Sequence, residues 1–120
     1  MLYMYYFILR SNGGIVDTQF KKGIIEVCVL SELDKQDTYG YSLVKNLSEH
    51  LDIGESTIYT MLRRLTNDKV LDQYEMQSSD GPTRKYYRLT GLGKERAQQL
   101  KSDWLKFNQK VNAILGENHE

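Results

Sequence analysis

The chain has 120 residues, the length of one ordinary domain, and its composition of 40% hydrophobic and 27% charged residues is that of a globular protein. Sixteen basic and sixteen acidic residues give a formal net charge of zero, so any charged partner must be sought in local clusters. The single cysteine, Cys28, cannot form an internal disulfide bond. This favours a reducing, cytoplasmic compartment and a buried, unreactive thiol.

The first nine residues are almost all apolar or aromatic, and the break Ser11–Gly14 follows them. This run is too short to span a bilayer, which needs roughly 20 residues, and it lacks the basic start of a signal peptide. Three interpretations stay open: a start that adds little, an arm packed on the domain, or a membrane-associating stub. We assign residues 1–19 to an N-terminal arm, ordered or disordered, and expect no membrane partner.

Two helices are predicted before residue 52. Phe20–Leu33 carries apolar residues on nearly every side, which is typical of a central, buried helix. Asp34–Asp37 is a polar turn, and Asp37 or Thr38 can cap the second helix. The second helix has one apolar face, formed by residues at spacings of four, three and four: Gly40, Val44, Leu47 and Leu51.

A short break at Asp52–Gly54 precedes a third predicted helix. Its buried stripe consists of Ile58, Met61, Leu62 and Leu65. The opposite face carries hydroxyl, amide and guanidinium groups, namely Ser56, Tyr59, Thr60, Arg63 and Asn67, with Thr57 and Arg64 on the flanks. Two short helices joined by a tight turn, the second polar on its outer side, form the helix-turn-helix pattern.

A β-hairpin is predicted next. Tyr74 and Met76 alternate with polar residues, Ser78–Pro82 is a loop by composition, and Arg84–Leu89 alternates again. A hairpin after a helix-turn-helix is a wing. Thr90 is then a suitable N-cap for a last, long helix.

The last helix carries an apolar stripe at spacings of three and four residues, as in a coiled-coil seam: Ala97, Leu100, Trp104, Phe107, Val111 and Ile114. A monomer with this stripe on its surface would expose a large apolar patch. We expect the stripe to be buried against the first helix, a partner chain or both, which favours a homodimer. The alternative is that Trp104 and Phe107 only complete the core of a monomer.

The basic residues are concentrated around the hairpin. Residues 84–101 contain six cations and one carboxylate, whereas residues 20–52 contain four cations and six carboxylates. Phosphate binding depends on such local clustering. We therefore expect the hairpin to face nucleic acid and the acidic part of the chain to face away.

Three motifs resemble the PadR family of transcriptional regulators. Glu55–Leu65 is similar to the recognition helix of that family, and Gly81–Gly93, with the sequence GPTRKYYRLTGLG, is similar to its wing signature. Tyr39-Gly40-Tyr41 followed by Leu43 matches the opening of its second helix. The resemblance runs from about Phe20 to Leu115.

The resemblance implies a mostly α winged helix-turn-helix fold in residues 20–90 and a dimerisation helix with tail in residues 91–120, as in the small PadR members. It implies a sequence-specific dimeric repressor that binds an inverted-repeat operator in double-stranded DNA and is released by a small molecule or another signal. The DNA-binding residues would be Tyr39, Ser56, Thr57, Tyr59, Thr60, Arg63, Arg64, Arg84 and Lys85. The dimer interface would comprise Leu100, Trp104, Phe107, Val111 and Ile114.

Two details of the resemblance concern single residues. Thr60 stands where the family often has proline, which changes the contact made at that point. Trp104 stands where some small members stack planar aromatic compounds at the dimer centre. Either Trp104 binds such an effector, or it simply fills the interface.

An enzyme is not expected. His50 and His119 lie far apart, and the sequence offers no metal-ligand spacing, no nucleophile with an evident base and no phosphate-binding glycine loop. No cofactor is expected either. Two rival functions stay open: a winged-helix protein-interaction module that has lost DNA binding, and a non-specific DNA-coating protein.

Overall fold

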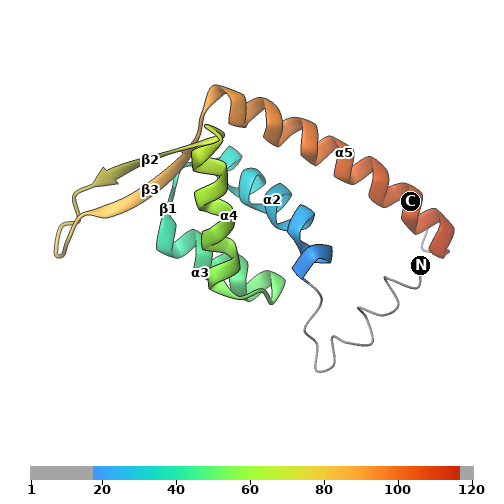
Figure 1. Ribbon diagram of the computed structural model, residues 1–120, viewed down its shortest axis with the longest axis horizontal. Coiled ribbons are helices and arrows are strands. Elements are labelled where there is room, and N and C mark those ends of the chain that lie inside the picture. The colour runs from blue at the N-terminus through green and yellow to red at the C-terminus, as the bar shows by residue number, and fades with distance from the viewer. Residues whose placement is uncertain (1–17, 117–120) are drawn as a thin grey trace.

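The structure, a computed structural model, describes residues 18–116, so the predicted N-terminal arm lies outside the described residues except for its last two positions. In the described part, three helices form one body, a hairpin extends from one side of it, and a long helix extends past it (Figure 1). The elements in order are α2 (Thr18–Lys35), β1 (Thr38–Tyr39), α3 (Gly40–Leu51), α4 (Glu55–Asn67), β2 (Leu71–Met76), β3 (Arg84–Leu89) and α5 (Gly91–Leu115).

The core lies between α2, α3, α4 and the base of the hairpin. Its buried side chains include Ile25 and Leu30 of α2, together with the predicted stripe of α4. The prediction that α2 is buried on all sides is wrong, because Ile24 and Val27 remain partly exposed. Cys28 is also half-buried, and burial followed by the charge of Glu32 raises the pKa of its thiol, which keeps the thiol protonated and unreactive.

The sheet has three antiparallel strands in the order β1-β3-β2. The predicted cap of α3 by Asp37 or Thr38 is wrong: Tyr39 occupies the N-cap position without a side-chain hydrogen bond, and Thr38 pairs with Tyr87 of β3. Pairing with β3 satisfies backbone groups of Thr38 and Tyr39 and holds both residues in the sheet. Gly40 then meets β3 so closely that a Cβ atom there would lie 2.8 Å from the Tyr87 ring.

The hairpin extends beyond the core. At its base Leu71, Tyr87 and Leu89 are buried, whereas toward its tip Met76 is 49% exposed. We expected Tyr74 and Met76 to form the buried side of β2. Only Tyr74 is partly buried, because the helices lie beneath the base of the strand and not beneath its end.

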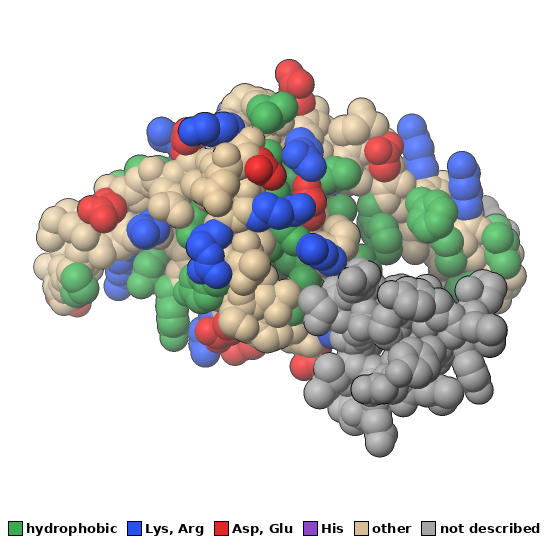
Figure 2. Space-filling view, viewed as in Figure 1, with side chains coloured by type: hydrophobic (Ala, Val, Ile, Leu, Met, Phe, Trp, Pro, Cys, Tyr) green, Lys and Arg blue, Asp and Glu red, His purple; other side chains and the backbone are tan. Residues whose placement is uncertain are grey.

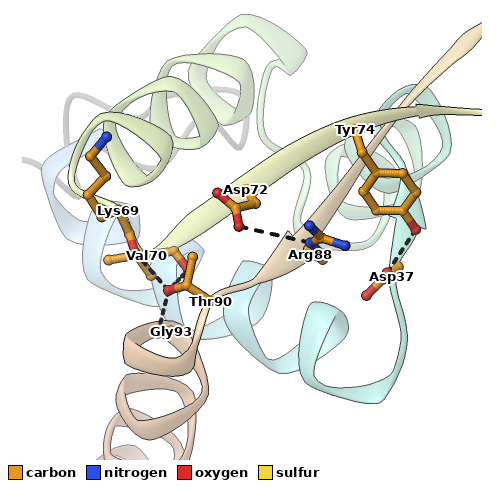
Figure 3. A network of polar contacts seen from close by, with 8 residues as sticks. All are labelled: Asp37, Lys69, Val70, Asp72, Tyr74, Arg88, Thr90 and Gly93. Carbon is orange, nitrogen blue, oxygen red and sulfur yellow. Dashed lines mark hydrogen bonds and ion pairs between the residues drawn. The ribbon is translucent and has the colours of Figure 1, made fainter.

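The predicted N-cap of the last helix is confirmed. The Thr90 hydroxyl oxygen accepts a hydrogen bond from Gly93 N at 3.0 Å and donates to the carbonyl oxygen of Lys69 at 2.7 Å (Figure 3). Thr90 thus ties the first turn of α5 to the segment between α4 and β2. Lys69 adopts a positive φ of 65°, which directs that segment back toward the sheet.

The long helix α5 packs on α2 through its N-terminal half. Gly93 and Ala97 are its buried residues, and Leu100 is partly buried against the core. Beyond this point the apolar stripe is left open by the single chain: Phe107 is 61% and Ile114 is 85% exposed. None of the helices in residues 18–116 has the length and apolar character needed to cross a bilayer.

Candidate nucleic-acid interface

The outer face of α4 is polar and exposed, as predicted. Ser56, Thr60 and Arg63 are exposed, and Thr57 and Tyr59 are partly exposed. The Thr60 hydroxyl donates to the carbonyl oxygen of Ser56 at 2.9 Å and accepts a hydrogen bond from Arg63 Nη2 at 3.3 Å. Thr60 therefore limits the directions in which the Arg63 guanidinium can point.

A groove of about 470 Å³ lies between the start of α3, α4 and the wing. It brings together five of the residues predicted to bind DNA, from three different elements: Tyr39, Tyr59, Arg63, Arg84 and Lys85. Residues that sequence reasoning did not assign to the site complete the lining: Gly40, Tyr41, Gln73, Thr83 and Tyr87.

The groove is positively charged. Arg63, Arg84 and Lys85 supply three cations, and none of the described residues that line it carries a carboxylate. Guanidinium and ammonium groups with phenol hydroxyls form a suitable surface for phosphate oxygens. The arrangement can therefore bind a polyanion beside the outer face of α4.

A row of tyrosines crosses the three strands beside this groove. Tyr86 pairs with Tyr39 on one side and with Tyr74 on the other, with ring centroids 5.9 and 5.6 Å apart. The Arg84 guanidinium lies 4.9 Å above the Tyr39 ring. A cation–π contact of this kind restricts the arginine while leaving its edge free to donate hydrogen bonds. Tyr39 thus orients Arg84 as well as lining the groove.

Charged side chains contact Tyr74, which lies at the far end of the tyrosine row (Figure 3). Arg88 lies 5.0 Å above the Tyr74 ring and 3.9 Å from the Asp72 carboxylate. The Tyr74 hydroxyl donates to Asp37 at 2.8 Å, and this hydrogen bond to a carboxylate raises the pKa of Tyr74. Arg88 is therefore partly neutralised, unlike Arg84.

The inner side of β3 joins the wing to the floor of the groove. Tyr87 is buried, which raises the pKa of its phenol, and Gln73 Nε2 donates to its hydroxyl at 3.2 Å. Tyr41 and Thr83 lie inside the motifs that carried the family resemblance, so those motifs pointed to them. No local signal identified Gln73, whose position depends on the pairing of β2 with β3.

Arg64 is a predicted DNA-binding residue whose side chain bonds to another helix and points away from the groove. Its Nη2 donates to Glu26 Oε1 of α2 at 2.8 Å, so its guanidinium is directed toward the helical body and it does not line the groove. Arg96, one of the six cations counted around the hairpin, also lies against Glu26. The basic run 84–101 is thus divided between the wing and α5.

The residues predicted for a dimer interface lie along α5, at the opposite end of the molecule from the wing (Figure 1). Hydrophobic side chains are visible along the C-terminal part of this helix (Figure 2). Trp104 is 38% exposed and Val111 partly exposed, so the stripe is accessible beyond Leu100.

A helix-turn-helix followed by a three-stranded sheet and a wing defines a winged-helix protein. Residues 29–99 match the model of the transcriptional regulator PadR-like family. The match covers more than half of the chain, and the chain belongs to this family. The fold and the family inferred from the sequence are both confirmed.

Solved structures of regulators support the assignment. The chain is 37% identical to a Streptococcus transcriptional regulator, with a TM-score of 0.73 and coverage of 82% of this chain and 98% of the other. It is 34% identical to a PadR-like transcriptional regulator from Bacillus cereus, with a TM-score of 0.73 and coverage of 82% and 97%. A protein of Lysinibacillus sphaericus described as uncharacterized is 29% identical over 105 residues, which are 84% of this chain and 96% of the other.

The chain is therefore a transcriptional regulator of the PadR family, a class that acts by binding DNA. Its relatives in this family are regulators and not enzymes.

Proposed function

We propose that the protein is a dimeric repressor that binds an inverted-repeat operator in double-stranded DNA in the cytoplasm. The observation that carries this proposal is the cationic groove beside α4, in which Arg63 of α4 and Arg84 and Lys85 of the wing lie together without an opposing carboxylate. A groove of this kind next to an exposed polar helix fits one strand of the DNA backbone while the helix occupies the major groove.

In this arrangement the outer residues of α4 divide into two groups. Ser56, Thr57 and Thr60 lie in the N-terminal half of the helix, where side chains of a recognition helix reach base edges. Tyr59 and Arg63 line the groove and contact the adjacent backbone. Arg63, which Thr60 orients, can also reach a guanine edge.

Dimerisation through α5 explains the open apolar stripe. Leu100, Trp104, Phe107, Val111 and Ile114 lie on one side of a helix whose C-terminal half has no neighbour in the described chain, and a second copy of the chain would bury them. A two-fold dimer presents two recognition helices, whose half-sites lie about one DNA turn, or a multiple of it, apart.

For Trp104 we propose packing within this dimer interface as the primary role. The second role is to bind a planar aromatic effector. Such an effector changes the separation or tilt of the two recognition helices only if it binds the two arrangements of the dimer with unequal affinity. Because Trp104 is the only tryptophan of the chain, its fluorescence reports on both roles. Quenching by planar aromatic compounds would establish the effector site, and no quenching across a broad panel would leave only the structural role.

Selection of bound sequences from a random DNA pool tests the function. We expect enrichment of an inverted repeat with half-site centres about 10 base pairs, or a multiple of this, apart. Retention of DNA without enrichment would identify a DNA-coating protein. Failure to retain any DNA at low salt would identify a protein-interaction module.

The double substitution Arg84→Ala with Lys85→Ala should weaken DNA binding most strongly at low salt. Log affinity falls with log salt, and removing one phosphate-binding cation makes this slope less steep by about 0.9. The slope of the double variant should therefore be less steep by nearly two units. Titrations by fluorescence anisotropy at several salt concentrations measure this slope. Lys106→Ala with Lys110→Ala removes the same charge from the exposed side of α5 and should leave the slope almost unchanged. Equal slopes for the wing variant and the wild type would remove the wing from the interface.

A further inference from the structure

A single carboxylate joins the recognition helix to the dimerisation helix. Glu26 of α2 accepts a hydrogen bond from Arg64 of α4 at 2.8 Å, and its other oxygen lies 3.1 Å from Arg96 Nε of α5. The Glu26 side chain is only 13% exposed, whereas the two arginine side chains are 46% and 42% exposed. The three residues therefore form a bridge between α4 and α5 that passes through α2.

The two halves of this bridge differ. Arg64 is well aligned on Oε1 of Glu26, but Oε2 has no aligned hydrogen-bond donor within the described residues although Arg96 is at ion-pair distance. The connection to α4 is therefore a directed hydrogen bond, and the connection to α5 is mainly electrostatic. A shielded carboxylate that loses one partner is left poorly compensated, so α4 and α5 are held in positions that keep both arginines close to it.

The bridge joins two helices with different roles in the proposed function: α4 binds DNA and α5 forms the dimer. Outside this bridge, Thr90 attaches the first turn of α5 to the segment that follows α4, and the rest of the connection runs through the protruding wing (Figure 1). Arg96 lies more than one helical turn beyond this attachment, so the bridge adds a second point that fixes the direction of α5 relative to α4. The angle between α4 and α5 determines where each recognition helix lies relative to the two-fold axis of a dimer. A change of one base pair in operator spacing moves a half-site by about 3.4 Å and turns it by about 34°, so this angle decides which spacing is bound.

We propose that Glu26 is a specificity-determining positioning residue, which fixes the half-site spacing of the operator by holding Arg64 of α4 and Arg96 of α5 together. This inference rests on the proposed function and assigns Arg64 to positioning, in place of the DNA contact expected from the sequence. Arg63, the neighbouring residue on α4, keeps the DNA contact.

The test uses the operator selected by the wild-type protein and two versions whose spacer is one base pair longer or shorter. For Glu26→Gln and Arg96→Met, we expect the ratio of affinities between the selected and altered spacings to fall at least threefold. Affinity for a DNA fragment with one half-site should stay within twofold of the wild type. Arg64→Met should behave in the same way. Glu32→Gln is the matched control, because it removes the same charge from α2, where Glu32, among the residues 18–116, forms an ion pair with Lys35 of the same helix and with no other element.

Thermal unfolding of each variant shows whether it is folded, and Arg96→Met keeps the Glu26–Arg64 bond if Glu26→Gln does not fold. A spacing ratio equal to that of the wild type in folded Arg96→Met would overturn the coupling and leave the proposed function intact. An Arg64→Met variant that loses single-half-site affinity would show instead that Arg64 contacts DNA. A wild-type protein that selects no symmetric site would refute the proposed function itself.

Discussion

Replacing Gly93 with alanine should destabilise the protein by about 3 kcal/mol, the upper part of the range for forcing an extra methyl group into a packed site. A Cβ atom at Gly93 would clash with the backbone carbonyl oxygen of Val70 and would lie 3.3 Å from the side chain of Leu89. The Val70 carbonyl cannot move away at low cost, because its oxygen accepts a hydrogen bond from the Thr90 backbone N–H at 3.1 Å and lies 3.1 Å from the Thr90 hydroxyl oxygen, which is shared between the Lys69 and Val70 carbonyls (Figure 3). The first turn of α5 must therefore shift, and with it the contact of α5 with α2.

Urea unfolding followed by circular dichroism measures this effect, with all variants at one protein concentration because dimer stability depends on concentration. Gly91→Ala is the matched control: Gly91 is the first residue of the same helix and a Cβ atom there meets nothing within 4 Å. Its stability should be unchanged or slightly higher, since alanine is the better helix former. If the free energy of unfolding of Gly93→Ala lies within about 0.5 kcal/mol of the wild-type value, the start of α5 accommodates the extra methyl group and the overpacking expected here is absent.

Replacing Phe107 with glutamate should convert the proposed dimer to a monomer. The Phe107 side chain is 61% exposed in the single chain, so the isolated fold tolerates a charge there, whereas a dimer interface would have to desolvate it. Sedimentation velocity at micromolar concentration measures the change of mass. Affinity for the full operator should fall by a factor on the order of 100, because two linked half-sites no longer bind as one unit.

Gln109→Glu is the control for the added charge. Gln109 is exposed and follows Phe107 by two positions on α5, about 200° around the helix, so it lies on nearly the opposite side. This variant should remain dimeric and bind the operator as the wild type does. If Phe107→Glu also remains dimeric, the apolar stripe of α5 is not the dimer interface.

Local patterns predicted most of the fold. The buried stripe of α4, the alternation of β3 and the Thr90 cap all depend on residues within a few positions of one another, and the structure contains each of them. The two-residue strand β1 could not be predicted in this way, because Thr38 and Tyr39 become a strand only by pairing with β3, almost fifty residues later. The exposed end of β2 has a similar origin: alternation predicts a strand but not where the core beneath it ends.

The same distinction separates the two adjacent arginines of α4. Both were predicted to bind DNA, Arg63 from the outer face of the helix and Arg64 from its flank, because helical periodicity does not show which other element packs against that flank. Arg63 lines the groove with Arg84 and Lys85, while Arg64 bonds to Glu26, a residue 38 positions earlier in the chain. Only the packing of α2 against α4 decides which arginine is free to contact a ligand.

By itself, the sequence determined the helix-turn-helix, the wing, the family and the presence of an apolar stripe on the last helix, since each rests on short-range periodicity or on a contiguous motif. The tertiary structure alone decided which cations share a groove, how the tyrosine row orients Arg84, and that Glu26 links α4 to α5. These features arise from contacts between elements that are distant in sequence. The type of a residue and its neighbours in the chain do not indicate which distant residue will contact it in the folded protein.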